Sequence, residues 1–207
     1  GHQSLIKDFV AECKSLSLIP VVFTFCPHPC LYFDPEKKHL ISSYNKKYEL
    51  LKELGVEQIV EIKFDEKLQN MTGKEFANET LLAVKGLQLL WVGHDFTFGR
   101  NKEDPSWIEE LDRGISFRKV SPFKVGDETV SSSLIRSYLT EGDVEAANRL
   151  LGRKFSIEGL VVHGKKLGRE IGFPTINLRV NYPFFIPALG VYQVSCLFDS
   201  QIYKGVM

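Results

Sequence analysis

The sequence predicts an α/β fold: a Rossmann-like domain with a parallel sheet, followed by the start of a second, all-β domain. Helical and extended patterns alternate as far as residue 120, which is typical of parallel sheets built by right-handed crossovers. After Arg153 the pattern changes to short β-rich runs punctuated by Gly and Pro. We therefore expect one domain over residues 1–152 and a second over residues 153–207.

The first helix and strand are predicted by two different apolar patterns. Apolar residues recur at a three-and-four spacing from Leu5 to Leu16, which predicts an amphipathic helix that ends before Pro20. The continuous run Val21–Phe25 predicts a strand that is buried on both faces. The alternation continues with helices at Tyr44–Leu54, closed by Gly55, and at Gly73–Lys85, and with strands at Gln58–Ile62, Gln88–Val92 and Ile115–Val120.

The later elements have local start and stop signals. Thr72 and Glu75 form a capping-box pattern at the start of the third helix. Two more helices are expected at Ser132–Thr140 and Val144–Leu151, joined by a turn over residues 141–143. Extended runs follow at Phe155–Val162 and Gly190–Phe198, too few strands to close a barrel, so this domain is expected to expose sheet edges.

The composition excludes several classes of protein. Lys plus Arg and Asp plus Glu number 26 each, so no global field favours nucleic acid or a membrane surface. The longest nearly apolar run, Leu87–Val92, is far shorter than the roughly 20 residues of a membrane span. With no apparent signal peptide and only 4 cysteines, a cytoplasmic protein is expected, and its oligomeric state is left open.

The segment CPHPC permits two interpretations. Cys26 and Cys30 flank His28, and all three residue types bind zinc. A closed zinc site needs four ligands, and no second Cys/His pair lies at the spacing of a zinc finger. The sequence favours the alternative, in which two small residues lie in a loop stiffened by proline.

Four groups of residues stand after predicted strands or at predicted helix starts, where backbone amides and the helix dipole favour phosphate. Since the carboxyl ends of parallel strands meet at one edge of a sheet, we expect the groups to converge there. Ser131–Arg136 also suits an ordinary serine N-cap with a solvated arginine, and Gly1–His2 also suits the remnant of a purification tag. The groups are Gly1–His2, Thr24–Pro29, Gly93–Asn101 and Ser131–Arg136.

Together, the segments GHQ, TFCPHP, VGHDFTFGRN and SSSLIR resemble the adenylyltransferase half of bacterial bifunctional riboflavin kinase/FMN adenylyltransferases, the FAD synthetases. These belong to the HxGH nucleotidyltransferases, and the resemblance makes His2 the second histidine of the pair. It implies transfer of AMP from ATP to FMN. The implied catalytic residues are His2, Ser132 and Arg136, the ATP site adds Gly1, Asp95 and Ser133, and the flavin site comprises Phe25, Pro27, His28, Phe96 and Phe98.

Some of these residues have simpler alternatives. Asp95 alone also suits a turn, and phenylalanines at such positions are more often part of the core than of a flavin site. Aromatic faces that do reach the ligand would stack on the isoalloxazine ring.

The segment Leu151–Leu178 resembles the opening of a riboflavin kinase domain, an all-β barrel that phosphorylates riboflavin with ATP. A glycine-rich hairpin with a proline turn is the simpler alternative. The resemblance assigns nucleotide binding to Gly164, Lys165, Gly168, Pro174, Thr175 and Asn177. It makes Thr175 and Asn177 ligands of Mg²⁺, which takes oxygen donors of this kind.

The chain departs from the family in two places. The family's glycine-rich first strand and first histidine would precede Gly1, and its catalytic glutamate lies in a segment that this chain lacks. The expected function, FAD biosynthesis, is therefore that of a longer protein, and the kinase half is expected to be inactive as presented. Two rivals remain: a single-activity nucleotidyltransferase acting on a non-flavin phosphate, and an inactive nucleotide-binding fragment.

Overall fold

Helices and strands alternate through the first unit, as the sequence predicts. The computed structural model describes residues 1–111, 114–164, 172 and 175–207, which form two compact units, residues 1–130 and 131–207. The first unit contains the helices α1 (His2–Ser15), α2 (Pro29–Phe33), α3 (Tyr44–Glu53), α4 (Glu66–Asn70) and α5 (Gly73–Phe76), the π-helix η1 (Ala77–Leu81) and the 3-10 helix η2 (Pro105–Glu110). Its strands are β1 (Val21–Cys26), β2 (Gln58–Lys63), β3 (Leu89–Gly93), β4 (Ser116–Val120), β5 (Lys124–Val125) and β6 (Glu128–Thr129).

The predicted parallel sheet is present as two separate pairs among the described residues. β1 pairs in parallel with β2, with Val21 opposite Gln58, and β3 pairs in parallel with β4, with Leu89 opposite Ser116. The first unit is thus a mixed α/β structure with small parallel sheets. In the expected Rossmann-like fold, β1 and β3 would belong to one continuous sheet, and here they belong to two.

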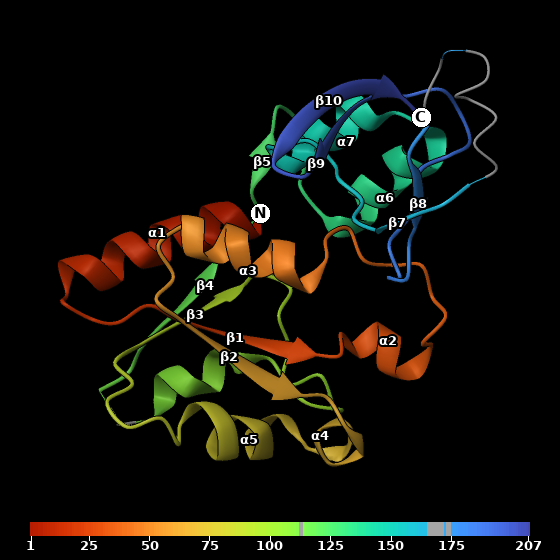
Figure 1. Cartoon of the computed structure of the whole chain (residues 1–207). Coiled ribbons are helices and arrows are strands. Elements are labelled where there is room, and N and C mark those ends of the chain that lie inside the picture. The colour runs from red at the N-terminus through yellow and green to blue at the C-terminus, as the bar shows by residue number, and fades with distance from the viewer. Residues whose placement is uncertain (112–113, 165–171, 173–174) are drawn as a thin grey trace. The chain divides into compact units, whose positions relative to one another are not determined.

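Packing covers both faces of β1, which is partly buried along its whole length, and this explains why its residues are almost all apolar. On one face, Val22 and Ile59 pack against the buried cluster formed by Val10, Leu51 and Val56. On the other, Phe23, Phe25 and Ile62 pack against a cluster of Phe76, Ala77, Leu81, Phe98 and Ile108. Figure 1 shows α1 and α3 on one side of these strands and α4 and α5 on the other.

One predicted helix is shorter than expected. The Thr72–Glu75 capping box is confirmed, since Thr72 Oγ1 accepts from Glu75 N and Glu75 Oε2 accepts from Thr72 N. However, the α-helical hydrogen bonding stops at Phe76 and a π-helical turn completes the element at Leu81, so the predicted extension to Lys85 is wrong. Ala77 and Leu81 of this turn are buried in the core, where packing rather than helix propensity decides the geometry.

The second unit begins with two helices and continues with short antiparallel strands. Among its strands, β7 pairs with β8 and β9 pairs with β10. β7 begins at Leu160, later than the expected start at Phe155. The elements are α6 (Ser132–Glu141), α7 (Val144–Leu151), β7 (Leu160–Val162), β8 (Asn177–Arg179), β9 (Gln193–Phe198) and β10 (Gln201–Val206).

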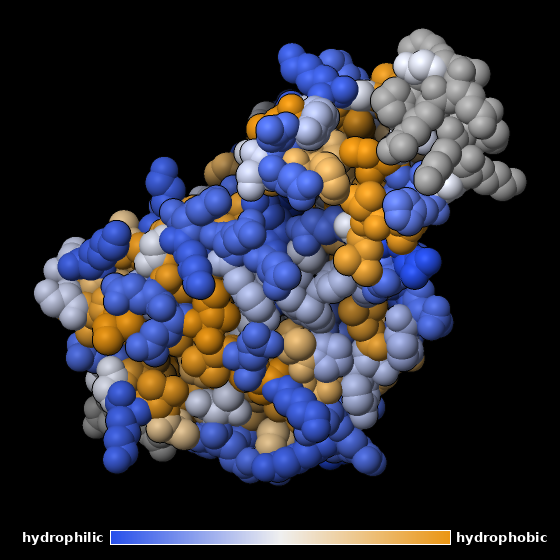
Figure 2. All heavy atoms as spheres, viewed as in Figure 1, coloured by the Kyte–Doolittle hydropathy of each residue, from blue (hydrophilic) through white to orange (hydrophobic). Residues whose placement is uncertain are grey.

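The surface carries many apolar side chains between hydrophilic ones, as Figure 2 shows in orange and blue. In the second unit the β9–β10 hairpin exposes Leu197, Ile202 and Val206. The strands that are described therefore do not bury a barrel core by themselves. None of the helices in the described parts of the chain is long and apolar enough to traverse a bilayer.

Candidate functional site

His2 is the first residue of the 14-residue helix α1, and Gly1 is its N-cap. The first backbone N–H groups of a helix have no acceptor within the helix and can bind an anion. The helix dipole also favours negative charge there. Desolvation lowers the pKa of the His2 imidazole, whereas the nearby carboxylate of Asp95 raises it. His2 and Asp95, both predicted to contact ATP, therefore lie close enough to interact electrostatically.

The TFCPHP segment forms the end of β1 and the turn into α2. The Cys26–Pro27 peptide bond is cis, and His28 is the N-cap of α2. The His28 ring accepts a hydrogen bond through Nδ1 from the backbone N of Cys30 at 3.2 Å, and the Cys30 thiol lies 2.9 Å from the same atom. The His28 backbone N–H donates to the Tyr44 hydroxyl at 2.6 Å. The turn at the carboxyl end of β1, where the sequence places Pro27 and His28, is thus held by hydrogen bonds of His28.

The GHDFTFGRN segment follows β3 and folds back onto the start of α5. Gly99 has a φ of +65°, and a Cβ at this position would lie 2.2 Å from the backbone N of Gly73, so glycine is required there for packing. Asn101 Oδ1 accepts from the same Gly73 N–H at 3.0 Å. The Asp95 side chain, in contrast, is 82% exposed. Much of the motif is therefore explained by packing, while Asp95 stays accessible.

The two phenylalanines of this segment differ in accessibility. Their rings pack edge to face, 5.0 Å apart, but Phe98 is only 1% exposed and belongs to the core cluster with Phe76. Phe96 is partly buried against the same cluster, as is Phe25. Phe25 and Phe96 thus retain exposed surface for a flavin, and Phe98 packs chiefly as a core residue.

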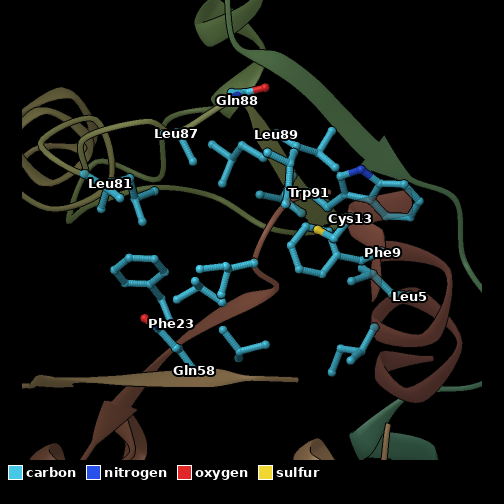
Figure 3. Close-up of a pocket in the computed structure, with 18 of the residues that line it drawn as sticks. Leu5, Phe9, Cys13, Phe23, Gln58, Leu81, Leu87, Gln88, Leu89 and Trp91 are labelled. Carbon is cyan, nitrogen blue, oxygen red and sulfur yellow. The ribbon is translucent and has the colours of Figure 1, made fainter. Parts of the chain in front are cut away.

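An apolar cavity of about 690 Å³ lies between the two parallel strand pairs of the first unit. Figure 3 shows Leu5, Phe9 and Cys13 of α1 on one side of it, with Phe23 of β1 and Trp91 of β3 among its other walls. The same cavity brings together four of the predicted site residues, His2, Phe25, Phe96 and Phe98.

The SSSLIR segment opens α6 in the second unit. Ser131 is the N-cap, and its Oγ accepts a hydrogen bond from Leu134 N at 3.1 Å. The serine N-cap that the sequence permits as a simpler interpretation is therefore Ser131 alone. Ser132 and Ser133 are exposed residues of the first turn, and Arg136 follows in the next turn, half-buried. Their hydroxyl and guanidinium groups remain candidates for phosphate, because residues three and four apart lie on one helix face.

Three of the kinase candidates, Gly164, Thr175 and Asn177, lie around the β7–β8 pair. Gly164 follows β7, and a Cβ there would lie 2.3 Å from Nδ2 of Asn177, the first residue of β8, so a larger residue would require the Asn177 side chain to shift. Thr175 is exposed two residues before Asn177. Lys165, Gly168 and Pro174 lie outside the described residues.

The described residues lend no support to zinc at CPHPC. In residues 1–111, 114–164, 172 and 175–207, no three His, Cys, Asp or Glu side chains are gathered to hold a metal ion. All four cysteines are free thiols.

Sequence reasoning missed Tyr44 and Lys47 of α3, which contact β1 and the loop after it. A tyrosine and a lysine on an amphipathic helix resemble an ordinary solvated face. No local pattern would have identified them.

Comparison with known proteins adds independent evidence. Residues 1–134 match the family model described as FAD synthetase, and residues 151–207 match the model described as riboflavin kinase. A crystal structure described as a macrolide-efflux protein from Streptococcus pneumoniae is similar to this chain, with a TM-score of 0.87 and 30% sequence identity. The alignment covers 99% of this chain and 68% of the chain in that crystal structure.

Curated relatives align with the whole chain. A bifunctional riboflavin kinase/FMN adenylyltransferase of Bacillus subtilis (strain 168) is 37% identical over 212 residues, which are 100% of this chain and 66% of the relative. The enzyme of the same name from Listeria monocytogenes is 31% identical over 210 residues, 100% of this chain and 67% of the relative. The chain thus spans about two thirds of the length of these relatives. Because the FAD synthetase model matches residues 1–134, more than half of the chain, the chain belongs to the FAD synthetase family.

Proposed function

We propose that the protein to which this chain belongs makes FAD in two steps, phosphorylating riboflavin with ATP and then transferring AMP from a second ATP to FMN. The observation that carries the proposal is the order of the two family matches, FAD synthetase over residues 1–134 and riboflavin kinase over residues 151–207. Its substrates are ATP, FMN and riboflavin, and we propose that it acts in the cytoplasm.

In the adenylyltransferase step, an oxygen of the FMN phosphate attacks the α-phosphorus of ATP in line and expels pyrophosphate. Such a reaction needs positioning and charge neutralisation and no covalent enzyme intermediate. We assign contacts with the triphosphate to His2, Ser132, Ser133 and Arg136, and a contact with the nucleotide to Asp95. The position of His2 at the start of α1, where the helix dipole favours anions, supports this assignment.

The flavin is assigned to the carboxyl ends of β1 and β3. Phe25 and Phe96 retain exposed surface beside the cavity, and Pro27 and His28 are held at the turn after β1. An aromatic face there would stack on the isoalloxazine ring.

For the kinase step, Thr175 and Asn177 offer a hydroxyl and an amide oxygen, donors that suit Mg²⁺. The close approach of Gly164 to the Asn177 amide supports a loop shaped around this side chain. The ion would neutralise charge on the ATP phosphates, while Gly164, with Lys165, Gly168 and Pro174, would enclose the nucleotide.

The cavity supports the expected Rossmann-like sheet. It separates two pairs of parallel strands, and one further parallel strand between β1 and β3 would join them. We propose that the family's first strand occupies this place. We also retain the proposed domain edge near Gly152, which the start of the riboflavin kinase match at residue 151 supports.

The function is tested by FAD formation from FMN, ATP and Mg²⁺, followed by chromatography, with the chain in its natural length. Arg136→Ala is expected to lower kcat/KM by about 100-fold or more, the effect of removing one group that stabilises transition-state charge. Lys154→Ala, which removes an exposed positive charge from the same unit, is the control and should retain activity. If the folded wild-type protein forms neither FAD from FMN nor FMN from riboflavin, the proposal is wrong and a non-flavin transferase replaces it.

A further inference from the structure

Three neighbouring groups hold the Lys47 ammonium against β1. Its Nζ donates to Thr24 Oγ1 at 2.9 Å and lies 4.7 Å from the centre of the Tyr44 ring and 5.1 Å from that of Tyr48. Burial lowers the pKa of Lys47, and the neighbouring Glu61 carboxylate opposes this shift. A lysine held in this way attaches the start of α3 to the second half of β1 and has little freedom to move.

Glu61 extends the same network across the sheet. It lies opposite Thr24 in the β1–β2 register. Burial raises the pKa of Tyr48 and Cys26, and a side-chain hydrogen bond with Glu61 raises each further. Both groups therefore stay protonated at neutral pH, and the Tyr48 side chain of α3 and the Cys26 side chain of β1 lie near this carboxylate of β2.

Tyr44 connects this network with the loop that follows β1. Its hydroxyl accepts the hydrogen bond from the His28 backbone N–H, while its ring lies beneath Lys47. Burial also raises the pKa of Tyr44, which keeps the phenol neutral. One turn of α3 therefore holds both the strand, through Lys47, and the loop containing Pro27 and His28, through Tyr44.

We propose that Tyr44 and Lys47 are positioning residues for FMN, which fix the Cys26–His28 turn in the geometry that receives the flavin. They act through the loop and need not touch the ligand. The inference rests on the proposed adenylyltransferase function and deepens it. It predicts an effect on FMN binding that is separate from ATP binding and from turnover, because the network ends at the loop after β1.

The test is steady-state kinetics of FAD formation with Tyr44→Phe in the protein at its natural length. This variant keeps the ring under Lys47 and removes only the hydroxyl that accepts from His28. The KM for FMN is expected to rise about five- to tenfold, the size of one net hydrogen bond, with kcat and the KM for ATP within about twofold of wild type. Lys47→Met should also raise the KM for FMN, and Lys47→Arg, which retains the charge between the rings, should partly restore it.

Lys46→Met is the matched control. It removes a neighbouring charge on α3 whose partner is Glu49, 2.9 Å away on the helix surface, and should leave all three constants unchanged. Thermal melting of each variant separates loss of folding from loss of positioning, and if Tyr44→Phe does not fold, Lys47→Met decides. An unchanged KM for FMN in a folded variant, or equal changes for FMN and ATP, would overturn the inference. A wild-type protein that makes no FAD would instead show that the proposed function has failed.

Discussion

Asp104 shows how one exposed carboxylate is tied into the fold at the residue scale. As the N-cap of η2 it accepts from Ser106 N at 2.9 Å, and its other oxygen pairs with Lys119 of β4. The hydrogen bond from Lys119, followed by those from Ser106, holds the Asp104 pKa well below its usual range. Asp104 therefore stabilises the fold only at pH values at which its carboxylate is ionised.

This pKa shift predicts a stability difference that depends on pH. Because the folded pKa lies below the unfolded value, the contribution is present above about pH 4 and is lost as the pH falls toward the folded pKa. Asp104→Asn, which retains a cap but loses the charge, should lower Tm at pH 7, and the difference from wild type should shrink below about pH 4. Melting curves from pH 7 to pH 3 measure this. Glu109→Gln, for which the described residues give no ion pair, is the control, and a difference that does not vary with pH would contradict the expectation.

At the scale of elements, α7 is defined by its two ends. Asp143 is the N-cap and its Oδ1 accepts from Ala146 N at 2.9 Å, while Gly152 adopts a φ of +65° at the C-cap. Between them Ala147 and Leu150 are buried, so the short helix is stable because its ends are capped and one face is packed.

The cap predicts the effect of two substitutions. Asp143→Ala should destabilise the protein by about 1 kcal/mol, because the Ala146 N–H loses its acceptor. Asp143→Asn supplies another oxygen acceptor and should stay within a few tenths of a kcal/mol of wild type. Urea denaturation compares the two variants. Equal losses would show that the charge of Asp143, rather than its capping bond, stabilises the helix.

At the scale of the whole molecule, the cavity between the two strand pairs leaves one edge of β1 and one edge of β3 without a neighbouring strand among the described residues. In a parallel strand successive N–H groups point to opposite neighbours, and the described residues pair β1 only with β2 and β3 only with β4. If a further strand fills the cavity in the natural protein, amides on the facing edges of β1 and β3 become hydrogen-bonded.

Hydrogen exchange tests this expectation. In this chain alone, the amides of β1 that face away from β2 should exchange rapidly, and in the chain extended by its native upstream sequence they should be protected by at least about tenfold. Amides of the β9–β10 hairpin in the second unit provide the internal control. Equal exchange at β1 in both chains would show that the upstream segment does not enter the sheet.

The sequence predicts most local elements because their signals lie within a few residues. The Thr72–Glu75 box and the turn over residues 141–143 act within about one helical turn, and α5 begins directly after Thr72 and α7 directly after the turn, as predicted. The apolar spacing from Leu5 to Leu16 locates α1, although this helix begins three residues earlier, at His2. The recognisable motifs likewise indicated the family, which the comparisons confirm.

Only the tertiary structure decided how distant residues meet. It buries Phe98 among core side chains, replaces the end of a predicted helix with the π-turn at Ala77–Leu81, and connects Lys47 with Thr24 across 23 positions of sequence. These outcomes depend on which surfaces are buried together and on which buried polar groups find partners. Both are properties of the assembled chain, because packing and hydrogen bonding join residues that no local pattern relates.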